Sequence, residues 1–196
     1  MKLVIASSNR GKIAEFQKLL ENSDIVLSSL SDYPDMPEIN EDGATFHDNA
    51  LKKARMTSSF TNLPSLADDS GLEVDALGGA PGVCSARFAL TSKARNDKLL
   101  TLLENVPAHK RTARFVCALA LVRPDGFEWT TLGVCEGTIT HEPRGSSGFG
   151  YDPVFYYAPF AKTFAEISSE IKNSVSHRGQ AMQAFKEAVS RDSILE

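Results

Sequence analysis

Strand-like and helix-like patterns alternate along the first part of this chain, and two strand patterns pair in its middle. A buried strand is predicted over residues 2–6, an amphipathic helix over 13–20 and a second short strand over 25–27. A long apolar strand over 113–122 is followed by a Pro-Asp-Gly turn and by an alternating run over 127–134, as in an antiparallel partner. The sequence therefore predicts an α/β protein with a mixed sheet, divided into two lobes with a cleft between them.

The other predicted elements follow from turn residues and helical spacing. Thr45 is the expected N-cap of a helix, with Asp48 at the capping-box position. The remaining expectations are a loop over 31–43, a helix over 45–59, a strand over 72–76, a loop over 78–82, a helix over 92–104, a glycine-dense loop over 145–150, and helices over most of 163–190 that are interrupted near Ser176.

Composition narrows the class of protein. The chain has 196 residues, of which 42% are hydrophobic and 23% charged, as is usual for a soluble globular protein. Its net charge of −4 argues against a general nucleic-acid partner. No apolar run approaches the ~20 residues that span a membrane, so no membrane partner is expected. Cys84, Cys117 and Cys135 lack the spacing of a metal site, and this usage of cysteine predicts a cytoplasmic protein.

Two adjacent carboxylates, Asp68 and Asp69, stand between short apolar runs and are followed by Ser-Gly. The pattern predicts them at the end of a strand, where the chain turns. Magnesium favours one or two carboxylates, with water and phosphate oxygens completing its shell. A divalent-cation site is one interpretation. The other is a plain turn, because Asp, Ser and Gly all favour turns.

A polar segment separates the first predicted strand from the first helix. Backbone N–H groups at a helix N-terminus, together with a lysine in the loop, form an anion-binding site. The segment does not have the Walker A pattern. The alternative interpretation is a polar strand-to-helix turn with an exposed lysine. The residues concerned are Ser7, Ser8, Asn9, Arg10, Gly11 and Lys12.

Acidic residues precede the helix predicted to begin near residue 45, and lysines lie within it. One acid of the segment Glu38-Ile39-Asn40-Glu41-Asp42-Gly43 is a candidate to complete the metal shell begun by Asp69. Lys52 or Lys53 is a candidate second phosphate contact. The alternatives are a solvated acidic loop and a solvated helix face.

The segment from Gly148 to Asp152 combines glycines with an aromatic ring and a carboxylate. Glycines let the backbone approach a ligand closely. Phe149 is a candidate to stack on a base, and Asp152 a candidate hydrogen-bond acceptor. The alternative is a tight turn with Phe149 in the core.

Ser176 is the expected cap of the last helix, which places His177 and Arg178 in its first turn. Cations are electrostatically disfavoured at a helix N-terminus, so this placement hints at a functional role. A surface pair of His and Arg is the alternative.

Taken together, seven blocks in this order resemble the inosine triphosphate pyrophosphatase family, whose bacterial members are called XTP/dITP diphosphatases. The resemblance runs from residue 3 to about residue 185. The blocks are Ser7-x-x-Asn9-x-x-Lys12, Thr45-Phe46-x-x-Asn49-Ala50-x-x-Lys53-Ala54, Ala67-Asp68-Asp69-Ser70-Gly71-Leu72, Gly78-Gly79-Ala80-Pro81-Gly82-Val83, Ser85-Ala86-Arg87, Gly148-Phe149-Gly150-Tyr151-Asp152-Pro153 and Ser176-His177-Arg178-Gly179.

The resemblance implies a role for each block. It implies one domain over 1–196, with an elongated mixed sheet flanked by helices. Asp69 is implied as the catalytic and metal-binding acid, and Glu41 or Glu38 as its partner for Mg²⁺. The substrate-binding residues implied are Ser7, Ser8, Asn9, Arg10, Gly11, Lys12 and Lys53 for the triphosphate, Ser70 beside the substrate, Phe149, Gly150, Tyr151 and Asp152 for the nucleoside, and Lys172, His177 and Arg178 for the base.

The implied activity is hydrolysis of ITP, dITP and XTP to the monophosphate and pyrophosphate, by a homodimer that removes non-standard purine nucleotides. Two alternatives stay open at this point. One is a Maf-like pyrophosphatase that prefers pyrimidine or modified nucleotides, and the other is a nucleotide-binding protein without turnover. The absence of a Gly-x-Ser-x-Gly elbow in the loop over 145–148 argues against acyl-transfer chemistry.

Overall fold

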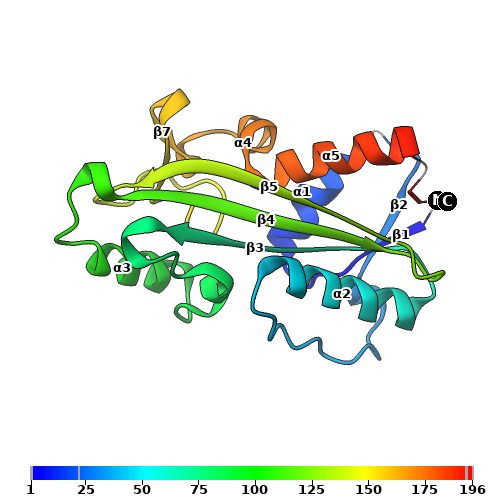
Figure 1. Cartoon of the computed structure of the whole chain (residues 1–196). Coiled ribbons are helices and arrows are strands. Elements are labelled where there is room, and N and C mark those ends of the chain that lie inside the picture. The colour runs from blue at the N-terminus through cyan, green and yellow to red at the C-terminus, as the bar shows by residue number, and fades with distance from the viewer. Residues whose placement is uncertain (1, 22, 193, 196) are drawn as a thin grey trace. The chain divides into compact units, whose positions relative to one another are not determined.

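The computed structural model describes residues 2–21, 23–192 and 194–195. Strands and helices alternate over the first third of the chain, as predicted (Figure 1). The elements are β1 (Lys2–Ile5), α1 (Arg10–Leu20), β2 (Val26–Ser29), α2 (Phe46–Thr61), β3 (Ser65–Val74), α3 (Ser92–Leu102), β4 (Thr112–Val122), β5 (Glu128–Ile139), β6 (Phe155–Tyr157), β7 (Lys162–Thr163), α4 (Ser169–Val175) and α5 (His177–Asp192), with short 3-10 turns between several of them.

The strands of the described residues form one seven-stranded mixed sheet in the order β2-β1-β3-β4-β5-β6-β7. β1 runs parallel to β2 and to β3, whereas β6 runs antiparallel to β5 and to β7. The turn between β4 and β5 is closed by the N–H of Arg123, which donates to the carbonyl of Phe127 at 2.9 Å. The predictions of an α/β protein with a mixed sheet and a central hairpin are confirmed.

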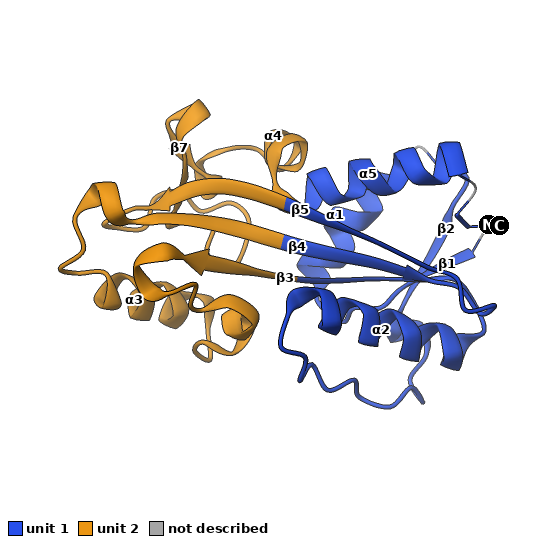
Figure 2. Cartoon of the chain, viewed as in Figure 1, with its two compact units in different colours: residues 1–69, 117–133, 178–196 blue, residues 70–116, 134–177 orange. Residues whose placement is uncertain are grey.

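The chain divides into two compact units (Figure 2). Unit 1 consists of residues 1–69, 117–133 and 178–196, and unit 2 of residues 70–116 and 134–177. Strand β3 passes from unit 1 to unit 2 between Asp69 and Ser70, and the chain returns to unit 1 between His177 and Arg178. Two of the sequence blocks therefore contribute residues to both units.

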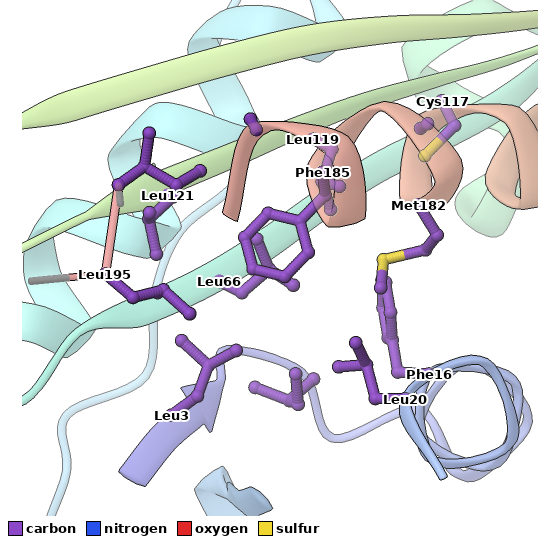
Figure 3. Close-up of a cluster of buried hydrophobic side chains, with 14 residues drawn as sticks. Leu3, Phe16, Leu20, Leu66, Cys117, Leu119, Leu121, Met182, Phe185 and Leu195 are labelled. Atoms are coloured by element: carbon purple, nitrogen blue, oxygen red, sulfur yellow. The ribbon is translucent and has the colours of Figure 1, made fainter. Parts of the chain in front are cut away.

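In unit 1, α1 and α5 cover one face of the strands and α2 covers the other (Figure 1). Phe16 of α1 and Met182 of α5 point toward each other, and Phe185 lies over Leu66 of β3 (Figure 3). Cys117 of β4 belongs to this buried cluster as well. The core holds α1, the start of β3 and α5 against one another, and these three elements carry several of the charged residues described below.

Unit 2 has its own core, which is rich in aromatic rings. Phe115, Phe155 and Phe164 pack with ring centroids 4.4–5.9 Å apart, at the close end of the usual separations for aromatic pairs. His177 extends the cluster, because its ring stacks on Phe115 at 4.8 Å with an interplanar angle of 14°.

Three local predictions were wrong. The aspartate pair does not end a strand, because β3 continues from Ser65 to Val74 and the N–H of Leu72 donates to Ser85 Oγ at 2.9 Å. Sheet pairing on both sides of β3 outweighs the turn preference of Asp-Ser-Gly. The first helix begins at Arg10 rather than Ile13, because Asn9 caps it. The helix expected from 163 begins only at Ser169, after β7 and a 3-10 turn.

No helix in the described parts of the chain is both long and apolar enough to cross a membrane.

Candidate active site

The segment predicted to bind phosphate, Ser7 to Lys12, leads into α1, and Asn9 caps that helix. Asn9 Oδ1 accepts hydrogen bonds from the N–H groups of Gly11, at 3.0 Å, and Lys12, at 3.2 Å. Ser7 Oγ accepts a further bond from the N–H of Asn9. Ser8, Asn9 and Arg10 are exposed. This leaves the positive end of α1 open to solvent, with Lys12 in its first turn.

Asp68 lies at the centre of a buried network of charges in unit 1. Its Oδ2 is 2.9 Å from Lys12 Nζ, and it accepts from Arg178 Nη2 at 3.0 Å and Arg178 Nε at 3.3 Å. Arg178 also donates through Nη1 to Glu15 of α1. Burial lowers the pKa of Arg178, but Asp68 and Glu15 outweigh it and hold that pKa above its ordinary value. Asp68 therefore binds α1 to the start of α5.

Asp69 has different neighbours. Its Oδ2 accepts from Asn49 Nδ2 at 2.9 Å, and its Oδ1 is 4.0 Å from Lys53 Nζ. Burial raises the pKa of Asp69, against the opposing effects of Lys53 and of the hydrogen bond from Asn49. Asn49 Oδ1 in turn accepts the N–H of Gly43 at 2.8 Å, so Asn49 connects Asp69 to the acidic loop.

Lys53 lies between the acidic loop and β3. It is 6% exposed, and its Nζ donates to the backbone carbonyl of Asp68 at 2.7 Å. The same nitrogen is 3.2 Å from Glu41 Oε1. Glu41 and Asp69 thus both face this ammonium group, whereas Glu38 is exposed and Lys52 pairs at the surface with Asp42.

The donor set around Lys53 fits Mg²⁺. The carboxylates of Glu41 and Asp69 are hard oxygen ligands, and one or two carboxylates are the usual protein contribution to a magnesium shell. No cluster of three or more His, Cys, Asp or Glu able to hold a metal occurs among the described residues.

A second group of predicted residues lies in unit 2. Asp152 Oδ2 accepts from the N–H of Phe149 at 2.8 Å and from Lys172 Nζ at 2.6 Å. Lys172 Nζ lies 4.6 Å from the centroid of the Phe149 ring. Phe149 is 37% exposed, so it is not the core residue that the alternative interpretation required.

Tyr151 and Gly150 are anchored to other parts of unit 2. The Tyr151 hydroxyl donates to the carbonyl of Ser85 at 2.8 Å, and burial raises its pKa. The carbonyl of Gly150, a residue with φ of 64°, accepts from Asn96 Nδ2 at 3.2 Å. These contacts fix the backbone of the predicted nucleoside segment.

The structure thus collects the predicted residues into two groups, one per unit. Lys12, Glu41, Lys53, Asp69 and Arg178 lie in the charged part of unit 1. The unit 2 group consists of Phe149, Gly150, Tyr151, Asp152, Lys172 and the stacked His177, while Ser70 lies half-buried in β3.

Two residues in the unit 1 contacts were missed by sequence reasoning. Asn49 appeared only as part of a block, and Glu15 was not singled out at all. Glu15 lies three positions after Lys12 and therefore on the same face of α1, which is the signal that was available.

Comparison with known proteins shows the family of this chain. The model of the Ham1 family matches residues 3–188. A dITP/XTP pyrophosphatase of Desulforamulus reducens is 52% identical, covering 97% of this chain and 96% of that protein. One of Geobacter sulfurreducens is 49% identical and covers 95% of each.

Solved structures give the same result. A HAM1 protein from Coxiella burnetii is similar with a TM-score of 0.89 and 42% identity, covering 97% of this chain and 98% of that one. A nucleoside-triphosphatase described as a dITP/XTP pyrophosphatase, from Mycobacterium abscessus, gives a TM-score of 0.78 and 46% identity, covering 94% and 98%. The resemblance inferred from the seven blocks is confirmed, and the chain belongs to the Ham1 family.

Proposed function

We propose that this chain is a Mg²⁺-dependent pyrophosphatase that hydrolyses dITP, XTP and ITP to the nucleoside monophosphate and pyrophosphate. The observation that carries the proposal is the environment of Asp69, a buried carboxylate that faces Glu41 across Lys53 and is oriented by Asn49. Relatives that are about half identical over nearly the whole chain bear the name dITP/XTP pyrophosphatase.

In this proposal, unit 1 binds the triphosphate and performs the chemistry. Asp69 orients a water molecule and takes its proton, and the water oxygen attacks the α-phosphorus. The bond from the α-phosphorus to its bridging oxygen breaks, and that oxygen leaves with pyrophosphate. Lys12, Lys53 and the N-terminus of α1 offset the charge of the phosphates.

Asp69 and Glu41 are the residues that would hold Mg²⁺. When bound, the ion neutralises phosphate charge and polarises the phosphoryl oxygens. Of the two acids proposed as partners of Asp69, Glu41 is the better supported, because it is 3.2 Å from the Lys53 ammonium that also approaches Asp69.

Unit 2 supplies the groups proposed for the base. Phe149 offers an exposed aromatic face, and Lys172 and His177 lie in the same unit. Donors that meet the 6-oxo group of hypoxanthine or xanthine would face another donor in adenine, and an unpaired buried donor gives strong discrimination. Arg178 remains a proposed base contact, although its guanidinium is already bound by Asp68 and Glu15.

A nucleotide panel tests this function. Turnover of ITP, dITP, XTP, ATP and the pyrimidine triphosphates would be measured with Mg²⁺, scoring both monophosphate and pyrophosphate. We expect the 6-oxo purine substrates to be preferred and both products to form in equal amounts. A preference for pyrimidine nucleotides would support the Maf-like alternative. Binding without product would indicate a nucleotide-binding protein.

A homodimer in the cytoplasm is part of the proposal. Two-fold pairs are the commonest assemblies of soluble proteins, and the cytoplasmic location rests on the cysteine usage of the sequence. Sedimentation at micromolar concentration tests the dimer, and a monomer alone would contradict it.

A further inference from the structure

We propose that Asp152 is a positioning residue that places Phe149 and Lys172 for recognition of the base, rather than a ligand of the substrate. The inference rests on the proposed function and specifies how its base-binding group is held together. One carboxylate oxygen, Asp152 Oδ2, accepts both the N–H of Phe149 and the ammonium group of Lys172. Asp152 is only 2% exposed, so these bonds lie inside unit 2.

The first consequence concerns the backbone of the glycine loop. Gly148 has φ of 75°, a conformation that favours glycine. A Cβ added at Gly148 would lie 2.1 Å from Asp152 Oδ2 and 2.9 Å from its Cγ. The carboxylate therefore occupies the space that any side chain at position 148 would need. The loop closes around Asp152, and its path at Phe149 depends on that contact.

The second consequence concerns Lys172. Its Nζ is 2.6 Å from Asp152 Oδ2, 4.6 Å from the Phe149 ring centroid and 5.8 Å from that of Phe164. An ammonium group near an aromatic face is attracted to the ring. Asp152 holds Lys172 of α4 against the ring of Phe149, which comes from the loop. One carboxylate thus fixes an aromatic face and a hydrogen-bond donor relative to each other.

These two groups suit one class of ligand. The exposed part of the Phe149 ring is able to stack on a planar heteroaromatic group, and Lys172 donates to a carbonyl oxygen at its edge. A base that carries an oxo group meets both requirements. We infer that base selectivity depends on Asp152 through the positions of these two side chains.

The test separates the contribution of the base from that of phosphate. Dissociation constants for IMP and for ribose 5-phosphate, which lacks the base, would be measured by calorimetry in the full-length protein. Their ratio reports base binding alone. Asp152→Asn removes the charge and keeps the shape, and we expect the ratio to fall about tenfold, with little change for ribose 5-phosphate.

Gly148→Ala is a second, independent change to the same contact. It removes no carboxylate from the protein, but the added Cβ forces the Asp152 side chain to move. We therefore expect the same loss of the base contribution to binding. Gly126→Ala is its control, because Gly126 has φ of 88° but nothing within 4 Å of an added Cβ. Asp125→Asn is the control for Asp152→Asn. Asp125 likewise accepts one hydrogen bond from a backbone N–H, that of Phe127, and one from a cationic side chain, that of Arg123.

A cycle with Phe149→Ala and Lys172→Met combined tests whether Asp152 acts through these two side chains. A positioning residue adds little once its targets are gone, so Asp152→Asn in the Phe149→Ala/Lys172→Met protein should change the ratio by less than about threefold. A full further loss on that background would mean that Asp152 contacts the ligand itself, and would overturn the proposal. A wild-type ratio in Gly148→Ala would also overturn it, and this variant decides the matter if Asp152→Asn does not fold.

These results are distinguishable from failure of the proposed function. Suppose that wild-type protein releases no pyrophosphate from ITP or XTP and yet binds IMP more tightly than ribose 5-phosphate. In that case the proposed activity is wrong, and the binding measurements still test the role of Asp152. If turnover is normal and the variants keep the wild-type ratio, the activity stands and the role of Asp152 is wrong.

Discussion

Asp68 and Arg178 are 110 positions apart in sequence and are joined by two hydrogen bonds, from Nη2 at 3.0 Å and from Nε at 3.3 Å, to the same carboxylate oxygen. The adjacent Asp69 instead faces Asn49, Lys53 and Glu41. Two neighbouring aspartates therefore have different surroundings: Asp68 neutralises buried cations, and Asp69 is the acid proposed for the chemistry. This division gives the first two predictions.

Asp69→Asn is expected to lower kcat by about a hundredfold or more, because an amide is neither a base nor a good magnesium ligand. Stability should change little, because burial already disfavours the charged form of Asp69, as its raised pKa indicates. Steady-state kinetics and thermal melting of the same preparation check both statements. Substantial turnover by a folded Asp69→Asn protein would remove Asp69 from its assigned role.

For Asp68→Asn, in contrast to Asp69→Asn, the main expected effect is a loss of stability. The substitution leaves Arg178 and Lys12 without the charge that neutralises them, and removal of one partner of a buried ion pair costs about 3–5 kcal/mol. Urea denaturation would measure the loss. Arg178→Met and the double variant complete a cycle, in which the two losses should be clearly less than additive. Additive losses would show that the pair is not coupled.

Lys12→Ala should weaken triphosphate binding by roughly tenfold or more, since a charge-assisted hydrogen bond is lost. The difference from wild type should shrink at high ionic strength, because the contact is electrostatic. The preference for ITP over ATP should not change. Measuring KM for both nucleotides at two salt concentrations checks this, and a changed preference would place Lys12 with the base-binding group.

Glu41→Gln and Glu38→Gln form a matched pair for the metal site. Loss even of an outer-shell partner lowers metal affinity about 10–100-fold, so loss of Glu41 should raise the Mg²⁺ concentration at half-maximal rate at least tenfold. Glu38→Gln should behave as wild type, because Glu38 is exposed and Glu41 is the acid beside Lys53. A larger effect at Glu38 would exchange the two assignments.

Thiol labelling should distinguish the three cysteines. Cys84 is exposed, whereas Cys117 and Cys135 are buried, and burial raises the pKa of Cys135 to about 12. The reactive species is the thiolate, so at pH 8 one thiol per chain should react quickly with a disulfide reagent. Cys84→Ser should abolish the fast phase. A fast phase that survives this change would contradict the burial of the other two.

Local signals in the sequence sufficed for much of the fold. Thr45 caps α2 as predicted, with its hydroxyl accepting the N–H of Asp48 at 3.1 Å, and α3 lies within its predicted range. The prediction failed where longer-range contacts decide. Thr163 and Glu166 form a capping box, but it closes a 3-10 turn after β7. The hydroxyl of Thr163 also donates to the carbonyl of Arg144, 19 positions away.

The candidate site was predictable as a set of residue types but not as a set of partners. Sequence blocks gave Asp68, Asp69 and Arg178 without saying which acid meets the arginine. That choice follows from the alternation of side chains along β3, which turns neighbouring residues to opposite faces. Since β3 was predicted to end at this pair, the alternation was not applied to it.

Few side chains other than asparagine can satisfy the contacts made at position 49. The Asn49 amide accepts from the N–H of Gly43 and donates to Asp69, so the oxygen and nitrogen ends are not interchangeable. Aspartate has the same shape but would set a second carboxylate against Asp69, while leucine would satisfy neither partner. A Cβ at Gly43 would lie 2.7 Å from Asn49 Oδ1, so the two positions constrain each other. In a saturation library selected for turnover, nearly all active variants should keep Gly43 and Asn49, although neither residue is assigned a step in the reaction.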